Sequence, residues 1–306
     1  MITVVGSLNL DLVVRVARLP DAGETLLASD YREYHGGKGA NQALAAARAG
    51  GTVAMVGRVG RDGAGEMLRD GLARAGVAVN DVTTADAPSG RALIEVDDAG
   101  ANRIVVVPGA NAYWGAHDLP LELLRRSSLV AIQREIPSRV VEAAIECARG
   151  AGVPVMVNAA PAEGFVLESL GPSDVLIVNE GEAALLSGAA EPSKHAVGAS
   201  EALKAARSLA RRGPGAVIIT LGADGAVQAG RSGEWHVAGF EVEPIDTTGA
   251  GDAFVGSWAV ARVEGRDARS ALRFACAAGA EAVTSAGAQS SLPTRSAIEA
   301  RLSAAR

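Results

Sequence analysis

The chain has 306 residues, of which 48% are hydrophobic and 21% are charged. This composition is globular, and the length is enough to bury a core without disulfides or a structural metal. The formal net charge is −6 and no long basic run occurs, which argues against a nucleic acid as a partner. No segment approaches the roughly 18 uninterrupted apolar residues of a transmembrane helix, so we expect no membrane association.

The N-terminal residues lack the basic region of a signal peptide and read as a β-strand. The two cysteines, Cys147 and Cys276, lie far apart without metal-ligand spacing. Buried thiols in a reducing compartment explain them best, so the expected location is the cytoplasm.

Short apolar runs alternate with amphipathic segments along the chain, a pattern typical of a mostly parallel sheet covered by helices. Residues 200–212 carry one apolar stripe and are predicted to be such a helix, whereas residues 191–199 read as an exposed connection. We predict an α/β fold in which residues 1–306 form one domain. Its expected inner strands are nearly continuous apolar runs at residues 2–5, 52–56, 129–132, 153–157, 175–178 and 216–221.

Two regions depart from this rhythm. Residues 12–16 and 25–28 read as short strands, and residues 91–97 and 103–107 read as a hairpin with one exposed face. We therefore expect residues of about 11–35 and 89–108 to form a separate small sheet. A small sheet beside an α/β core is suited to act as a lid.

The segment DTTGAGD at residues 246–252 follows an extended stretch and opens an apolar helix that runs to about residue 263. Free backbone amides at Gly249, Ala250 and Gly251, at the start of a helix, would attract an anion. Asp252 would point toward that anion, which suits a general base that takes a proton from an attacking hydroxyl. The alternative is that Asp252 only stabilises the helix N-terminus.

Two further segments could bind a polar ligand. GGKGANQA at residues 36–43 starts a helix but lacks the spacing of a Walker A loop; Lys38 supplies positive charge and Asn41 can donate and accept hydrogen bonds. GSLNLD at residues 6–11 follows the first strand, and Asn9 and Asp11 are spaced to point the same way. A glycine-rich helix start and a solvated turn are the alternatives.

Three other strand ends carry polar residues. QRE occupies 133–135, NEGE occupies 179–182 and TLGADG occupies 220–225. Asn179 and Glu182 have the spacing of a capping box, and residues 220–225 equally suit a plain hairpin. The four histidines are scattered, and neither GxSxG nor GxGxxG after a strand is present, which weakens hydrolase and dinucleotide-dependent reductase readings.

Together these segments resemble the ribokinase (PfkB-type) family of sugar kinases. The motifs GSLNLD, GGKGANQA, QREIP, NAAPA, VNEGEA, TLGADG, DTTGAGDAFVG and GAQSSLP occur in the family's order over about residues 2–293. The resemblance implies a three-layer fold with a small β-sheet lid. It also implies transfer of the γ-phosphoryl group of ATP to a primary hydroxyl of a pentose, converting D-ribose to ribose 5-phosphate.

The resemblance also implies roles for individual residues. Asp252 matches the catalytic base, and Gly249, Ala250 and Gly251 match the anion hole. Positions that contact the sugar are matched by Asn9, Asp11, Gly37, Lys38, Asn41 and Glu135. Positions of the nucleotide site are matched by Asn179, Thr220, Gly222, Asp224 and Gly225, with Glu182 acting on Mg²⁺ and phosphate through water. A site for a monovalent cation, expected to be K⁺, is matched by Asp246, Thr248, Ala282, Ser285, Gly287 and Ser291.

The chain departs from the family pattern at two places. Cys276 stands near the adenine, where relatives often have His or Asn, and residues 158–161 read NAAP instead of Asn-Pro-Ala-Pro. The first departure leaves the nucleotide preference open. Because lids in this family pair between two subunits, the resemblance further implies a homodimer formed through the lid.

Alternatives to a ribose kinase stay open at this point. A kinase of the same family could act on deoxyribose, fructose, a 2-keto-3-deoxy sugar acid or a nucleoside. A non-catalytic regulator that binds a sugar or nucleotide on the same scaffold is a further alternative. Asp11, Asn41 and Glu135 together favour a polyhydroxylated sugar, and the intact residues 249–252 favour catalysis.

Overall fold

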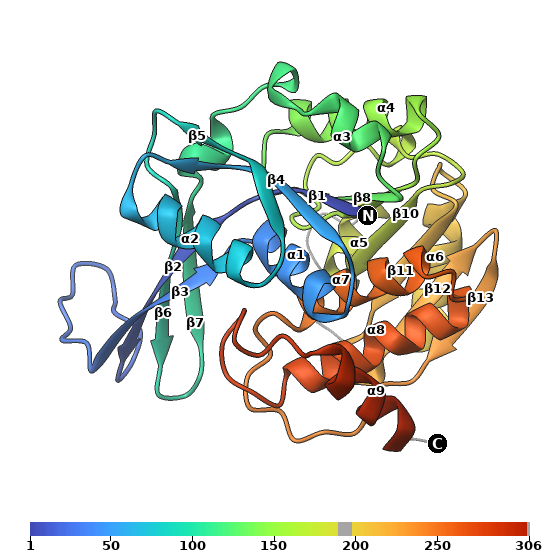
Figure 1. Ribbon diagram of the computed structural model, residues 1–306. Helices are drawn as coiled ribbons and strands as arrows, with labels where there is room; N and C mark the ends of the chain where they lie inside the picture. The colour runs from blue at the N-terminus through green and yellow to red at the C-terminus, as the bar shows by residue number, and fades with distance from the viewer. Residues whose placement is uncertain (189–197, 305–306) are drawn as a thin grey trace.

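The computed structural model describes residues 1–188 and 198–304, and a large, mostly parallel sheet runs through them (Figure 1). In this part of the chain its nine strands have the order β13-β12-β11-β10-β9-β8-β1-β4-β5. Only β12 (Ala226–Gly230) and β13 (Gly233–Val237), at one edge, join by antiparallel pairing. The parallel strands are β1 (Ile2–Val5), β4 (Val53–Gly60), β5 (Ala78–Ala85), β8 (Leu129–Gln133), β9 (Val155–Asn158), β10 (Val175–Asn179) and β11 (Ala216–Thr220).

Helices cover both faces of this sheet and enclose two hydrophobic cores, which confirms the predicted fold class. None of the helices in the described ranges has the length and apolar character needed to cross a membrane. One face is covered by α1 (Lys38–Arg48), α2 (Gly63–Arg74), α7 (Ala250–Val263), α8 (Ala268–Ala282) and α9 (Arg295–Ala304). The other is covered by α3 (Leu121–Arg125), α4 (Ser138–Gly150), α5 (Glu180–Leu186) and α6 (Ala199–Ala210), and short 3₁₀ turns are η1 (Gly109–Ala112), η2 (Ala116–Asp118), η3 (Leu167–Ser169) and η4 (Gly222–Asp224).

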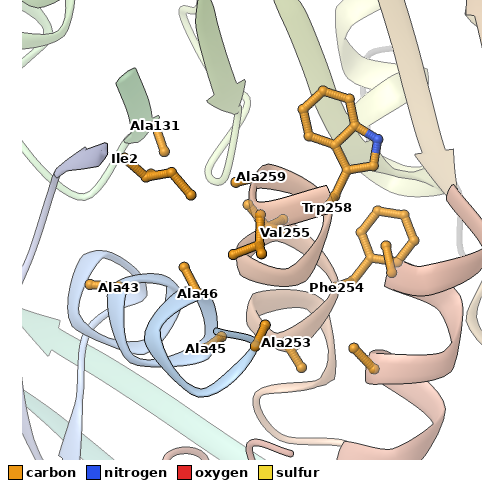
Figure 2. Packing of buried hydrophobic residues seen from close by; sticks show 14 of the residues in the cluster. Ile2, Ala43, Ala45, Ala46, Ala131, Ala253, Phe254, Val255, Trp258 and Ala259 are labelled. Atoms are coloured by element: carbon orange, nitrogen blue, oxygen red, sulfur yellow. The ribbon is translucent and has the colours of Figure 1, made fainter. Parts of the chain in front are cut away.

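Helices α1 and α7 pack closely against each other, and this contact positions the site described below. Figure 2 shows alanines of α1 facing Ala253 and Val255 of α7. Gly256 makes the approach possible, because a Cβ there would lie 2.7 Å from both the Ala45 Cβ and the Gln42 carbonyl oxygen. Small residues on both helices therefore bring the first turn of α7 beside the first turns of α1.

A separate small sheet follows β1 directly. Its four strands, in the order β3-β2-β6-β7, are β2 (Asn9–Val16), β3 (Asp30–Gly36), β6 (Gly90–Asp97) and β7 (Asn102–Val107). The predicted small sheet and its hairpin are thus confirmed, while its role as a lid stays a prediction.

The prediction of a strand at residues 25–28 was wrong. That apolar run lies outside every strand, with Leu27 94% exposed, and β3 supplies the pairing instead, with Asn9 opposite Gly36. Residues 30–36 are mostly polar and mostly exposed or half-buried, so β3 carries no hydrophobic run by which the sequence could identify it. Of the predicted connection at 191–199, residues 191–197 lie outside the described residues.

Candidate active site

Polar residues from several parallel strands meet at one edge of the large sheet. Gln133 and Asn158 are the last residues of the neighbouring strands β8 and β9, and Asn179 and Thr220 are the last residues of β10 and β11. The turn after β1 leads from this same edge into β2 of the small sheet. Ligands of open α/β sheets bind beyond the carboxyl ends of the strands, so this edge is the candidate site.

The start of α1 is anchored to the turn after β1. Gly37 has φ +87°, and a Cβ there would lie 2.7 Å from the Asn9 backbone nitrogen, so only glycine fits. The Glu135 carboxylate accepts hydrogen bonds from the Ser7 hydroxyl at 2.6 Å and from the Lys38 backbone N–H at 3.0 Å. The structure thus brings Gly37, Lys38 and Glu135 together, with Ser7 as a partner that the sequence analysis missed.

Asp252 lies in the first turn of α7, after the N-terminal Gly249 with φ +80°. Its side chain is buried, with only 8% exposed. One carboxylate oxygen accepts a hydrogen bond from the Asn41 side-chain amide and the other from that of Gln42, both at 2.9 Å. Burial raises the pKa of Asp252, while the charge of Lys38 and the two amide donors oppose this effect.

Lys38 balances a group of carboxylates at this edge. Burial lowers its pKa, but the negative charges of Asp252, Glu135 and Glu182 outweigh burial, so the net effect raises the pKa of Lys38 and keeps it charged. The pKa of Asp11 is raised to about 7, first by burial and then by repulsion from Glu135 and Asp252. The Asp11 carboxylate packs against Gly36, where a Cβ would lie 2.1 Å from its Oδ2.

The elevated pKa of Asp11 gives a testable dependence of stability on pH. The unfolded chain releases this proton near pH 3.8 and the folded protein near 7, so between these values the folded state holds more protons. The contribution of Asp11 to the free energy of unfolding therefore falls as pH rises through that window. We expect Asp11→Asn to raise Tm relative to the parent by an amount that grows from about pH 5 to about pH 8.

Thermal unfolding at several pH values measures this difference. Asp70→Asn removes an exposed negative charge on α2 and controls for net charge. A difference in Tm between Asp11→Asn and the parent that stays constant with pH would contradict the assignment.

Asn9 is fixed by a residue that the sequence analysis did not single out. The Asn9 Oδ1 accepts a hydrogen bond from the Asn111 side-chain amide at 2.8 Å, and the buried Asn111 also bonds both backbone groups of Leu8 at 3.0 Å. The side-chain oxygen of Asn9 therefore already has a hydrogen-bond partner inside the protein. Its amide group stays as the donor that a ligand could use.

The predicted nucleotide residues lie at the ends of β10 and β11. Asn179 and Glu182 form the capping box of α5, with reciprocal hydrogen bonds of 2.8 Å between each side chain and the other residue's N–H. Burial raises the pKa of Glu182. The hydrogen bond from the Asn179 N–H and the positive charge of Lys38 lower it, but burial outweighs them. Thr220 lies opposite Asn179 in the sheet.

The rest of this group forms a turn and a core position. Gly222 and Asp224 belong to η4, and Gly225 with φ +90° begins the antiparallel hairpin into β12. Cys276 lies buried on α8, and burial raises the pKa of its thiol to about 12. The capping-box and hairpin interpretations are therefore confirmed, and the nucleotide roles stay predictions.

Two of the predicted cation-site residues contact a third, Asp246, whose carboxylate accepts hydrogen bonds from the backbone N–H groups of Thr248 and Gly287 at 2.9 and 2.8 Å. These hydrogen bonds outweigh burial and lower the pKa of Asp246. Ala282 is the last residue of α8, and Ser285 and Ser291 lie in the segment that follows it. There the Ser285 N–H donates to the Ala282 carbonyl, and the Ser291 hydroxyl donates to the carbonyl of Ala288, beside Gly249. Among the described residues no three His, Cys, Asp or Glu side chains cluster as metal ligands.

Four buried or half-buried amides were missed as members of the site. They are Gln42, Gln133, Asn158 and Gln289, and each is linked by hydrogen bonds to Asp252 or to a residue that touches it. Gln133 and Asn158 each end a buried strand, and Gln42 follows Asn41 directly in the glycine-rich motif. Those positions were the signal that could have identified them.

Comparisons with known proteins identify the family of this chain. The family model described as pfkB family carbohydrate kinase matches residues 1–295. The ribokinase of Bacillus subtilis is 39% identical over 305 residues, covering 99% of each chain. A crystal structure of ribokinase from Thermotoga maritima superimposes with a TM-score of 0.90 at 36% identity, covering 99% of each chain.

The structure of Arabidopsis thaliana ribokinase complexed with ribose and ATP matches with a TM-score of 0.87 at 32% identity, covering 98% of each chain. The resemblance drawn from the sequence motifs is thereby confirmed. A family match over nearly the whole chain and close relatives of equal length lead to one conclusion: the chain belongs to the pfkB family of carbohydrate kinases.

Proposed function

We propose that this protein is an ATP-dependent sugar kinase that transfers the γ-phosphoryl group to the primary hydroxyl of D-ribose, giving ribose 5-phosphate. The observation that carries the proposal is a buried carboxylate, Asp252, at the start of α7, in hydrogen-bond contact with α1, the helix that the glycine-rich segment starts. Relatives named ribokinase over the full length of the chain, one of them bound to ribose and ATP, support this substrate pair.

The sugar would bind where the small sheet meets the large one. Asp11 and Glu135 offer carboxylate oxygens that accept hydrogen bonds from neighbouring hydroxyls, and Asn9 and Lys38 offer donors. This mixture suits a ligand with several hydroxyl groups. Each oxygen of Asp252 accepts one hydrogen bond from α1 and keeps a lone pair, so Asp252 can take the proton of the primary hydroxyl as its oxygen attacks phosphorus.

The transferred phosphoryl group would be held by the backbone amides at the start of α7. Gly249, Ala250 and Gly251 turn into the helix there, and the Ala250 N–H also donates to the Thr247 carbonyl at 3.3 Å. Gly251 is exposed and a Cβ there would touch nothing within 4 Å, so no side chain is packed over this position. Helix-start amides and the helix dipole both stabilise the charge that develops on the phosphoryl oxygens.

The residues near Asp246 fit a monovalent cation, which we propose to be K⁺. The side-chain and carbonyl atoms that could coordinate the ion are all oxygens. The Asp246 carboxylate, whose pKa is lowered, balances its single positive charge. Such an ion would add positive charge beside the start of α7. Mg²⁺ would arrive with the nucleotide and keep several waters, so one carboxylate, that of Glu182, is sufficient for a contact through water.

We also propose that the small sheet is the lid of the predicted single domain and that two subunits pair through it. Its edge strand β7 is exposed along its full length. Apolar side chains on β6 and β7 are 45–61% exposed, namely Leu93, Ile104, Val105, Val106 and Val107. Leu93 and Val105 pair across the two strands and share one face with Val107, whereas Ile104 and Val106 point to the opposite face. We propose that the face of Leu93, Val105 and Val107 forms the dimer contact, since exposed apolar surface of this kind marks an interaction site.

A charge on this face is expected to separate the subunits. Val105 pairs with Leu93 across β6 and β7, so Val105→Asp places a carboxylate among apolar groups that the dimer would bury. Sedimentation at micromolar concentration should show a dimer for the parent and a monomer for the variant. Val166→Asp, at a 56% exposed position in the large-sheet part, is the control. A parent that sediments as a monomer would exclude the dimer.

Measurement of ADP release with a panel of sugars tests the proposed reaction. The panel holds D-ribose, deoxyribose, fructose, a 2-keto-3-deoxy sugar acid and a nucleoside, each with and without K⁺. We expect the highest kcat/KM with D-ribose and faster turnover with K⁺. A higher kcat/KM with another member reassigns the substrate, and ribose binding without any phosphorylated product favours the regulator.

A further inference from the structure

A network of buried side-chain amides connects Asp252 to the ends of two central strands. Gln42 is 1% exposed and its amide nitrogen donates to Asp252 Oδ1 and to Asn158 Oδ1, both at 2.9 Å. Its carbonyl oxygen accepts from the Gln133 amide at 2.6 Å. The Asn158 amide in turn donates to the Ile177 backbone carbonyl at 3.1 Å.

This chain of contacts fixes which end of the Gln42 amide faces Asp252. A backbone carbonyl such as that of Ile177 can only accept, so Asn158 must turn its nitrogen to Ile177 and its oxygen to Gln42. Gln42 must then present its nitrogen to Asn158, and the same nitrogen reaches Asp252. The Gln133 amide, which donates to the Gln42 oxygen, holds the opposite end.

We propose that Gln42 is a positioning residue that orients Asp252 and stabilises its ionised form, with Asn158 and Gln133 fixing the direction of the Gln42 amide. The inference rests on the proposed function, because it assigns Gln42 a role through the proposed base. Gln42 leaves one lone pair of Oδ1 for the sugar hydroxyl. It therefore acts on the carboxylate and not on the substrate.

The surroundings of Asp252 make such a donor necessary. Burial disfavours the charged carboxylate and Glu135, on the segment after β8, adds negative charge, while Lys38 and Asn41 on α1 oppose them. Asp11 on β2 also faces Asp252, whose charge contributes to the raised pKa of Asp11. A hydrogen bond from a fixed amide favours the ionised form, which is the form that accepts the proton. Removing that donor therefore shifts the balance toward protonated Asp252.

The test is Gln42→Leu, assayed with ATP and D-ribose. We expect kcat to fall about 10- to 100-fold, since a hydrogen bond to a charged group is lost. The KM for ribose should change less than about twofold, because Gln42 does not touch the sugar in this scheme. The acidic limb of the kcat profile should move to higher pH; kcat is used because saturating ribose covers Asp11.

A matched control is Gln228→Leu, another buried glutamine, 2% exposed on β12 and bonded to Ser232. It should leave kcat and the pH profile unchanged. If Gln42→Leu does not fold by circular dichroism, Gln42→Glu keeps the volume, places a second carboxyl group beside Asp252, and should give the same shift of the acidic limb.

A double variant separates positioning from a general structural effect. In the Asp252→Asn background Gln42→Leu should change the residual rate less than about twofold, because its partner is gone. An equal loss in both backgrounds, or an unmoved acidic limb, overturns the inference. Normal turnover by Gln42→Leu beside an inactive Asp252→Asn overturns this inference alone. Normal turnover by Asp252→Asn removes Asp252 as the base and this inference with it, whereas a parent protein that does not phosphorylate ribose overturns the proposed function.

Discussion

Replacing Asp252 by Asn is expected to lower kcat by at least about 100-fold, because a positioned general base contributes roughly 10²–10⁴ in rate. Asparagine has the same shape but cannot take the proton of the sugar hydroxyl. It also turns one NH₂ group toward a donor, either Asn41 or Gln42, so one hydrogen bond is lost, while the cost of a buried charge disappears. We therefore expect a folded protein with little activity.

ADP release with saturating ribose and ATP measures the loss, and circular dichroism with thermal unfolding checks the fold. Asp252→Glu serves as the companion variant, since it keeps a carboxyl group but places it one methylene farther from the backbone of α7. It should recover part of the rate. Turnover near the parent value in Asp252→Asn would remove this residue from the role of base.

Gly251→Pro is expected to be nearly inactive. Proline deletes the backbone N–H that would hold the transferred phosphoryl group, and the loss of one such donor costs about 3 kcal/mol in transition-state stabilisation. The position itself tolerates proline in the fold, because the first turn of a helix has no intrahelical partner for this N–H. The effect should therefore appear in kcat while the thermal unfolding midpoint stays close to that of the parent.

Gly251→Ala is the matched control for this variant. A Cβ at position 251 meets no atom within 4 Å, and alanine keeps the N–H, so activity should stay within a few-fold of the parent. If proline and alanine reduce kcat equally, the amide is not the group that matters, and the anion hole must be sought elsewhere in the turn.

The sequence predicted the inner part of the fold because buried parallel strands are continuous apolar runs. All six expected inner strands are present. The unexpected strands lie at or next to the edges of the large sheet: β5 and β13 are its edge strands, and β12 lies between β13 and β11. Most residues of β5 and β13 are exposed or half-buried, and β12 is short and contains only one large apolar residue, Val227. Edge strands have one unpaired side and need no hydrophobic run, so composition alone does not reveal them.

The sequence also indicated which motifs converge, since parallel strands end at one edge. The expected contact between α1 and Asp252 is present as the hydrogen bond from Asn41. The sequence could not show which polar groups already have hydrogen-bond partners inside the protein. Asn179 and Glu182 bond each other, and Gln42 faces Asp252 only because Gly256 lets the two helices approach. Such pairings depend on distances between elements that are remote in the chain.

The turn of residues 6–8 carries the chain from the large sheet into the small one, and it divides the groups proposed to bind sugar between two bodies. Asn9 and Asp11 lie on β2 of the small sheet, whereas Asn41 and Asp252 lie on α1 and α7, which pack against the large sheet. If the small sheet moves as the proposed lid, Asn9 and Asp11 move away from the other sugar-binding groups together with it. With the sheet withdrawn, transfer of phosphate to water would be suppressed as long as no carbohydrate is bound. Opening of the lid would therefore limit wasteful hydrolysis of ATP.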